Sequence, residues 1–176
     1  MTHGRILYLE DVHVSFDGFK AINGLNLDIA PGELRCIIGP NGAGKTTFFN
    51  AISGVQAPSS GQLLVNGRDL CGHPPHHYAA AGIARTFQTP RVFADMSVAA
   101  NIDFGLQFAG RRRKGSWHLR DETSILELIG LTHLAALPAG AITPSQQRAL
   151  ESGMALATLP RLLLLDEVAA GLTETE

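Results

Sequence analysis

Residues 39 to 47 have the types and spacing that phosphate chemistry requires. They read Gly-Pro-Asn-Gly-Ala-Gly-Lys-Thr-Thr, which fills the pattern G-x-x-x-x-G-K-[ST]. Glycines let the backbone curl so that several N–H groups converge on one anion. Lys45 supplies a mobile cation for the β- and γ-phosphates, and Thr46 supplies a hydroxyl ligand for Mg²⁺. The predicted ATP-binding residues of this loop are Gly39, Pro40, Asn41, Gly42, Ala43, Gly44, Lys45, Thr46 and Thr47.

The flanks of this loop predict the elements that position it. The apolar run Leu34 to Ile38 precedes it, and such a run is typical of a strand buried on both faces of a parallel sheet. Cys36 lies inside that run and is predicted to be a small buried hydrophobic residue. A helix over about Lys45 to Ile52 follows, with Gly54 as its stop. The positive end of that helix would face the anion.

A second apolar run predicts the other half of the site. Leu162 to Leu165 read as a fully buried strand that ends on Asp166 and Glu167. In open α/β folds, ligands bind at the carboxyl edge of the sheet. Asp166 would hold Mg²⁺, through water, and Glu167 would polarise the attacking water. The alternative is a pair of solvated acidic residues, but a phosphate loop in the same chain favours the site.

The remaining pattern indicates an antiparallel part and a helical part. Ile6 to Phe16 and Ala21 to Ile29 read as strands joined at Asp17-Gly18, a hairpin turn. Gln62 to Val65 reads as a further strand before a tight turn at Asn66-Gly67.

Helical spacing begins at Val98, continues over residues 125 to 129, and returns from Gln146 to Thr158. The order predicts an α/β domain with a helical insertion between two strands of a central parallel sheet.

Composition bounds the function classes. The chain has 176 residues, 45% hydrophobic and 17% charged, with a formal net charge of -2. That size suits one compact domain, and the charge does not favour nucleic acid as a partner. The dense basic run Arg111 to Lys114 reads as a solvated segment, or else as a contact for lipid headgroups or an acidic partner. No apolar stretch is long enough to span a membrane.

Cysteine and histidine spacing does not predict a metal site of its own. Cys36 and Cys71 lie far apart and have no zinc-ligand spacing. Residues 71 to 77 read as a loop with His73, His76 and His77, and two prolines interrupt any regular ligand geometry.

From Phe16 through the phosphate loop to Asp166-Glu167, the chain resembles the ATP-binding subunits of ABC transporters. Within them it is similar to the branched-chain amino-acid importer group, which includes urea-type relatives. Gly82 to Gln88 resembles that group's Q-loop region, and Ala169 to Thr173 its D-loop. The resemblance covers nearly the whole chain.

The resemblance implies an α/β fold: a P-loop NTPase (RecA-like) core with an antiparallel β subdomain and a helical subdomain insertion. Residues 1–88 and 158–176 would form the β subdomain and core, and residues 89–157 the helical subdomain.

The resemblance also implies roles for two further residues. Phe16 matches the aromatic residue that stacks on adenine, with a core strand aromatic as the alternative. Gln88 matches the glutamine that senses Mg²⁺ and the γ-phosphate and touches the membrane subunit, with an ordinary loop residue as the alternative. The implied catalytic residues are then Glu167 and Gln88, and the implied metal ligands are Thr46, Gln88 and Asp166.

The family's signature segment departs from its usual Leu-Ser-Gly-Gly-Gln. Ile142 to Gln146 here read Ile-Thr-Pro-Ser-Gln, and the resemblance implies that Thr143, Ser145 and Gln146 contact the ATP of a second subunit. Thr143 and Gln146 keep the form of a capping box. Pro144 removes an N–H donor, and Ser145 adds a Cβ. A weaker grip on that ATP is expected.

Two departures follow Asp166. Val168 stands where proline is common, and no histidine follows Asp166, so the family's switch histidine is absent. His133 lies too early in the chain to replace it. The chain therefore reads as C-terminally incomplete, and an uncovered sheet edge or hydrophobic face is expected.

Three functions follow from these patterns. The first is an ATPase subunit of an importer, on the cytoplasmic face of the inner (plasma) membrane. Its partners would be a second nucleotide-binding subunit, permease subunits and, indirectly, a solute-binding protein, but no nucleic acid. The second is a truncated or degenerate module that binds nucleotide with little turnover. The third is a soluble ABC ATPase acting on DNA or the ribosome, which usually carries long insertions that this chain lacks.

Overall fold

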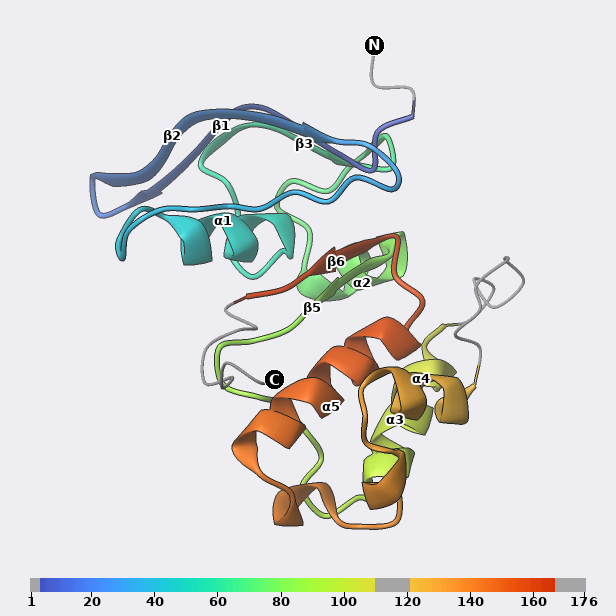
Figure 1. The fold of residues 1–176 in the computed structure, drawn as a ribbon. Helices are drawn as coiled ribbons and strands as arrows, with labels where there is room; N and C mark the ends of the chain where they lie inside the picture. The colour runs from blue at the N-terminus through green and yellow to red at the C-terminus, as the bar shows by residue number, and fades with distance from the viewer. Residues whose placement is uncertain (1–3, 110–120, 167–176) are drawn as a thin grey trace. The chain divides into compact units, whose positions relative to one another are not determined.

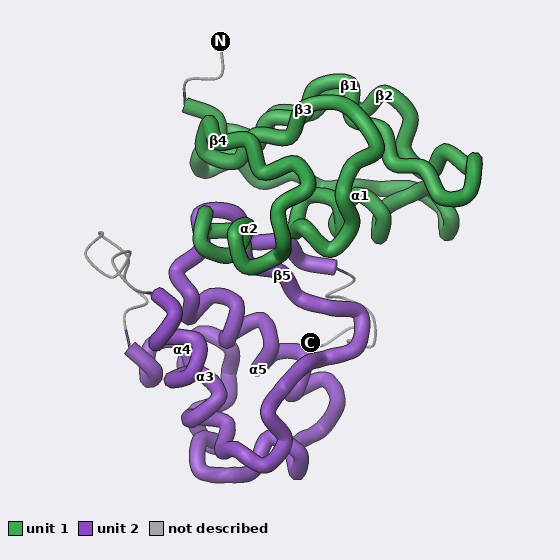
Figure 2. The backbone as a smooth tube through the Cα atoms, turned by 180° about the vertical axis from the view of Figure 1, so that it is seen from behind, with its two compact units in different colours: residues 1–83 green, residues 84–176 purple. Residues whose placement is uncertain are grey.

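The structure is a computed structural model of the 176-residue chain and describes residues 4–109 and 121–166. The chain has two compact units, residues 1–83 and residues 84–176 (Figure 2). Residues 84–88 and 158–166 thus belong to the same unit as residues 89–109 and 121–157, the described part of the predicted helical subdomain. The predicted grouping of residues 158–176 with residues 1–88 stays a prediction.

The first unit is built on a sheet of order β2-β1-β3-β4 with antiparallel pairing throughout (Figure 1). Its inward face is apolar because alternate residues of each strand point the same way. Leu7 and Leu9 of β1 are buried before a register shift at Asp11, where φ is 48°, and Val12 and Val14 are buried after it, so the shift moves the alternation by one residue. The strands are β1 (Leu7–Phe16), β2 (Phe19–Ile29), β3 (Ser60–Val65) and β4 (Arg68–Asp69).

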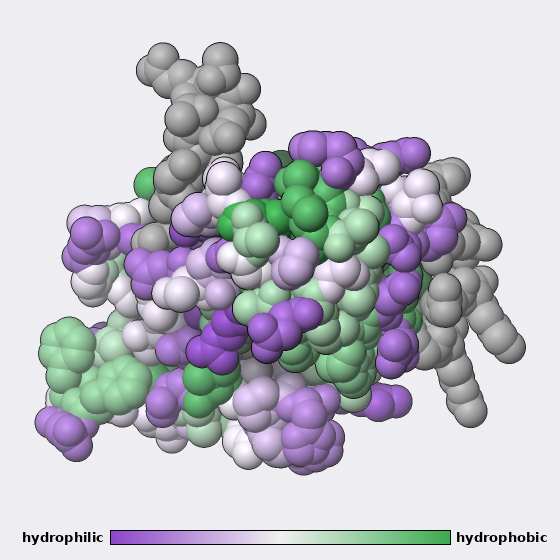
Figure 3. All heavy atoms as spheres, turned by 90° about the horizontal axis from the view of Figure 1, so that it is seen from below, coloured by the Kyte–Doolittle hydropathy of each residue, from purple (hydrophilic) through white to green (hydrophobic). Residues whose placement is uncertain are grey.

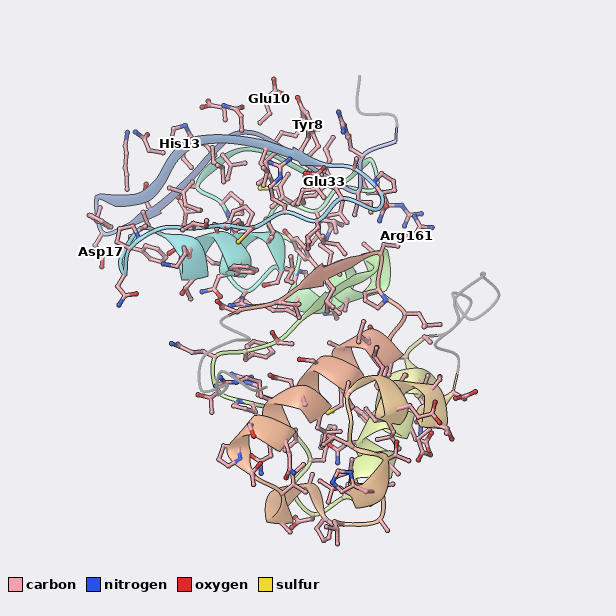
Figure 4. All side chains as sticks on the ribbon, in the orientation of Figure 1. Tyr8, Glu10, His13, Asp17, Glu33 and Arg161 are labelled. Carbon is pink, nitrogen blue, oxygen red and sulfur yellow. The ribbon has the colours of Figure 1, made fainter. Side chains whose placement is uncertain are left out.

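Both tight turns predicted in this sheet are confirmed. Asp17 and Gly18, at the end of the β1–β2 hairpin (Figure 4), have φ of 46° and 87°. Asn66 and Gly67 have φ of 50° and 74° between β3 and β4. Positive φ at both central residues is the two-residue hairpin geometry that Asn, Asp and Gly accept most readily.

Helix α1 (Lys45–Ile52) has the bounds that the sequence predicts. Phe48, Ala51 and Ile52 form its buried side. Gly54 follows the helix with φ of 76°, a left-handed conformation that glycine adopts without strain.

The strand predicted over Leu34 to Ile38 is wrong. These residues have no regular secondary structure, and Leu34 and Ile38 are 97% and 90% exposed. Cys36 is exposed as well, contrary to its predicted burial. A strand needs hydrogen-bonded neighbours, and no strand in the described parts of the chain pairs with this run. The run is therefore an exposed apolar segment with no strand partner in the described parts of the chain.

The predicted loop over residues 71 to 77 is also wrong in its second half, where helix α2 (Pro75–Ala81) begins. Pro75 suits the first helical turn because its missing N–H would have no helical partner there. Tyr78 anchors the helix: its hydroxyl donates to the carbonyl of Leu70 at 2.6 Å. Burial raises the pKa of Tyr78 to about 12. The turn also brings Nδ1 of His73 within 3.0 Å of Nδ1 of His77.

The second unit contains three α-helices in its described part, together with β6 and all of β5 but its first residue, which pair as a small sheet. The helices are α3 (Val98–Gln107), α4 (Glu122–Leu128) and α5 (Pro144–Ala157). The strands are β5 (Ile83–Arg85) and β6 (Leu162–Leu164). Short 3-10 turns at Thr132–Leu134 and Ala139–Ala141 connect α4 to α5.

Helices α3 and α5 approach closely because each has a glycine at the contact. A Cβ on Gly105 would lie 2.7 Å from the carbonyl oxygen of Met154. A Cβ on Gly153 would lie 2.7 Å from Ile129 and 2.9 Å from Ile102. The resulting core is apolar and includes Val98, Ile102, Leu106, Ile125, Leu126, Leu131, Leu150 and Ala157.

Strand β6 is shorter and less buried than predicted. It ends at Leu164, its first two residues are half-buried, and Leu165 is exposed. In the described residues its only sheet partner is β5, so the central sheet expected from the sequence has two strands here.

No helix among the described residues is long and apolar enough to cross a membrane. On the face seen in Figure 3, hydrophobic and hydrophilic side chains are interspersed.

Candidate functional site

The phosphate loop is a turn that glycines make possible. Gly42 and Gly44 have φ of 83° and 85°, and the amide of Ala43 donates to the carbonyl of Pro40. A Cβ on Gly44 would lie 2.8 Å from the carbonyl oxygen of Ala21 in β2. Only glycine fits at this point, since any side chain would push the end of the loop away from the sheet.

Lys45 holds its ammonium group against the start of the same loop. Its Nζ donates to the carbonyl oxygens of Gly39 at 2.6 Å and Pro40 at 2.9 Å. These neutral acceptors fix the long side chain inside the loop. A phosphate oxygen carries formal charge and forms a stronger charge-assisted hydrogen bond with the same group.

The amino end of α1 is left open for an anion. Gly44 is its N-cap residue and offers no side-chain acceptor, and the first turn contains no acidic residue. The first amides of a helix need acceptors from outside it, and the helix dipole favours a negative one. Thr46, in this first turn, is exposed, so its hydroxyl is available as a ligand.

Phe16 lies in the same unit, where β1 turns into β2. Its side chain is 43% exposed, and its cross-strand partner Phe19 is more exposed still. Phe16 is therefore not a core aromatic. The hairpin end and the loop before α1 lie at the same end of the unit (Figures 1 and 2). Stacking of Phe16 on adenine stays a prediction.

In the second unit, the backbone around Gln88 is held by side chains from α5. Oε1 of Glu151 accepts from the amides of Phe87 at 3.3 Å and Arg91 at 3.1 Å. Nη2 of Arg148 donates to the carbonyl of Gln88 at 3.4 Å. The Gln88 residue itself is exposed.

Asp166 follows β6 and is paired with a residue of β5. Its Oδ2 lies 3.1 Å from Nη2 of Arg85, with only 7% of the arginine and 11% of the aspartate side chain exposed. The amide of Asp166 also donates to the hydroxyl of Thr86, whose own amide donates to Leu164. The two strands thus fix the carboxylate in place.

The predicted residues Glu167, Val168 and Ala169 to Thr173, as well as the basic run Arg111 to Lys114, lie outside the described residues.

Comparison with known proteins decides the family. A family model described as "ABC transporter" matches residues 22–170 of the chain. The chain belongs to the ABC transporter family.

Curated ABC relatives include branched-chain amino-acid transport proteins. The chain is 35% identical to the high-affinity branched-chain amino acid transport ATP-binding protein BraF of Pseudomonas aeruginosa, over 97% of this chain and 72% of BraF. It is 37% identical to LivG of Escherichia coli K12, over the same shares of the two chains. LivG of Archaeoglobus fulgidus is 34% identical, over 95% of this chain and 69% of the relative.

Solved ABC structures share the fold. The ADP conformation of MJ1267, an ATP-binding cassette of an ABC transporter, matches with a TM-score of 0.79 and 32% identity, over 96% of this chain and 71% of MJ1267. CbiO1 of Clostridium perfringens, part of a transporter complex, matches with a TM-score of 0.78 and 28% identity, over 97% and 68%. The predicted fold class, a P-loop NTPase with an antiparallel sheet and a helical region, is confirmed.

The altered signature of this ABC chain folds as the sequence predicts. Thr143 is the N-cap of α5, and the capping box with Gln146 is complete. The amide of Thr143 donates to Oε1 of Gln146 at 2.9 Å, and the amide of Gln146 donates to Oγ1 of Thr143 at 3.3 Å. Pro144 occupies the first helical turn, and Oγ of Ser145 lies 3.2 Å from Oγ1 of Thr143.

Two residues of the ABC site region were missed by sequence reasoning. Arg85 gives no local signal, because its partner Asp166 lies 81 positions away. Glu151 gives a weak local signal, because it follows Leu150 on the buried side of α5. A charged residue at such a position requires a specific partner.

Proposed function

We propose that this chain is the ATP-binding, energy-coupling subunit of an importer for branched-chain amino acids or related small polar solutes. The observation that carries the ATP-binding part is the position of Lys45, whose ammonium lies inside a glycine turn at the open amino end of α1. The transported solute comes from the relatives BraF and LivG, which are described as branched-chain amino-acid transport proteins.

The chain's own residues account for nucleotide binding. The amides of residues 39 to 47 and Lys45 would hold the phosphates, and Phe16 would stack on adenine. Thr46, Gln88 and Asp166 offer hydroxyl, amide and carboxylate oxygens, the hard donors that suit Mg²⁺. When bound, Mg²⁺ would neutralise charge on the phosphates.

Hydrolysis would need Glu167 and a second subunit. Glu167 would orient and polarise the attacking water, and Gln88 would report the γ-phosphate to the permease. Thr143, Ser145 and Gln146 would contact the ATP of a partner subunit in a head-to-tail dimer. The chain would act at the cytoplasmic face of the inner membrane through permease subunits.

One specific observation favours a second candidate, a nucleotide-binding module with little turnover. Pro144 gives the signature segment no amide at a position where the family's usual residue has one, and Ser145 carries a side chain where glycine is usual. Both changes would weaken the contact to the partner's ATP.

Phosphate release from Mg·ATP by the purified chain, beside its Glu167→Gln variant, separates these functions. The importer function predicts that the variant binds ATP like the wild type and loses turnover, because only the base for water is removed. Equal turnover in both proteins would exclude Glu167 from the reaction. Binding without turnover in the wild type would establish the second candidate.

A further inference from the structure

Glu151 is a buried acid at an unusual position in the helical unit. It lies in the middle of α5 and is 5% exposed. Its Oε1 accepts two hydrogen bonds, while its Oε2 is buried without a hydrogen-bond partner among the described residues. Burying a carboxylate costs free energy of folding. A buried glutamate in the middle of a helix therefore indicates a specific role.

Both hydrogen bonds of Glu151 go to one short segment. The amide of Phe87 precedes Gln88 directly, and the amide of Arg91 follows it by three residues. One oxygen therefore ties the two ends of the turn that presents Gln88. The sequence separations are 64 and 60 residues, so this is a tertiary contact and not a local cap.

Arg148 adds a third point of contact from the same helix. It lies three residues before Glu151, close to one helical turn, and donates to the carbonyl of Gln88. The guanidinium of Arg91 in turn covers the ring of Phe87, at 4.3 Å from the ring centroid. Two side chains of α5 thus hold backbone groups before, at and after Gln88.

The amino end of α5 is the signature segment, fixed by the Thr143 capping box. Glu151 lies eight residues further along the helix, a rise of about 12 Å at 1.5 Å per residue. A helix transmits displacement of one end to the other because its backbone hydrogen bonds keep it rigid. A displacement of Thr143 would therefore be passed to Glu151 and, through its two hydrogen bonds, to the segment that contains Gln88.

We propose that Glu151 is a positioning residue that holds Gln88 in place and couples it to the signature end of α5. The nucleotide part of this inference rests on the proposed function, because the proposed function assigns Gln88 to the γ-phosphate and Mg²⁺. The structural part, the tie between α5 and residues 87–91, stands on the hydrogen bonds alone.

Two substitutions of Glu151 distinguish the loss of its hydrogen bonds from the loss of the fold. Glu151→Gln keeps an acceptor oxygen at nearly the same place and serves as the matched control. Glu151→Met fills similar space and removes both acceptors. Phe87 is only half-buried and Arg91 is exposed, so water can replace the lost acceptors and the variant should fold.

Amide exchange followed by NMR on the full chain measures the tie directly. We expect the Phe87 and Arg91 amides to exchange about fivefold faster in Glu151→Met than in wild type, as the loss of one hydrogen bond each implies. Exchange in Glu151→Gln should stay near the wild-type rate, and amides of the α3 core, such as that of Ile102, should not change. Equal protection of Phe87 and Arg91 in all three proteins would overturn the inference.

The selectivity for Mg·ATP over Mg·ADP measures the effect of this contact on nucleotide binding. The proposed function assigns Gln88 to the γ-phosphate, so Glu151→Met should weaken Mg·ATP binding severalfold and leave Mg·ADP binding unchanged. Glu151→Gln should restore the ratio of the two affinities. An equal loss for both nucleotides would indicate a merely structural role and would overturn the positioning role. If the wild type binds neither nucleotide, the proposed function fails, and the exchange rates alone decide whether Glu151 ties α5 to the Gln88 segment.

Discussion

Arg85 and Asp166 form a buried ion pair, with Nη2 and Oδ2 3.1 Å apart. Arg85 ends β5 and Asp166 lies two residues after the end of β6, so the two strands are joined both by backbone pairing and by this contact. Arg85 also lies near the ring of Phe87, with its guanidinium carbon 5.3 Å from the ring centroid. The aspartate predicted to serve Mg²⁺ is thus already partnered by a cation of the same unit.

Loss of Arg85 alone should be costly. Arg85→Met leaves the Asp166 carboxylate buried without its partner, and breaking such a pair typically costs about 3–5 kcal/mol of the free energy of unfolding. The double variant Arg85→Met, Asp166→Asn should recover much of that loss, because the uncompensated charge is gone. Urea unfolding of the two single variants and the double variant measures the coupling energy; purely additive effects would contradict a buried pair.

Restoring the usual glycines in the signature segment should strengthen ATP-dependent dimerisation. Pro144→Gly with Ser145→Gly restores an amide donor and removes a Cβ, so ATP-dependent association with a second nucleotide-binding subunit should strengthen. Analytical ultracentrifugation with and without Mg·ATP measures the dimer fraction. Thr143→Ala is the opposing control, because it removes the cap of α5 at a cost of about 1 kcal/mol. An unchanged dimer fraction in the glycine variant would mean that the altered segment is tolerated.

The raised pKa of Glu151 predicts that the stability of the chain depends on pH. Burial raises the pKa of Glu151 above its ordinary value of 4.5, and hydrogen bonds from the amides of Arg91 and Phe87 oppose that shift only in part. The folded chain then binds this proton more tightly than the unfolded chain does. The stability that this group contributes is present in full below pH 4.5 and is lost as the pH rises through the raised pKa.

The Glu151→Gln variant does not titrate at this position. Its Tm relative to wild type should therefore increase between pH 4.5 and pH 8. A Tm difference that is constant over this range, or that falls with rising pH, would contradict a raised pKa.

Local signals in the sequence predicted the local parts of the fold. The bounds of α1, the Asp17-Gly18 and Asn66-Gly67 turns and the Thr143 capping box depend on residues within a few positions of each other. Glycine conformations, proline-compatible first turns and side-chain caps are decided at that range. The phosphate loop is of the same kind, since its shape depends on its own glycines.

Features that depend on distant partners could not be predicted in this way. The run Leu34 to Ile38 has strand composition, but strand formation requires a neighbour that the described chain does not give it. The Arg85–Asp166 pair and the Glu151 contacts join residues 60 or more positions apart. No spacing rule links such residues, and only the fold brings them together.

Mg·ATP binding by the purified chain, measured beside Lys45→Ala, tests whether residues 39 to 47 bind the phosphates. Lys20, an exposed lysine of β2, provides the matched control Lys20→Ala. We expect tight binding by the wild type and by Lys20→Ala, and loss of binding in Lys45→Ala, because Lys45 places its ammonium inside the phosphate loop. Equal ATP affinity in Lys45→Ala and wild type would contradict the assignment of residues 39 to 47 as the phosphate site.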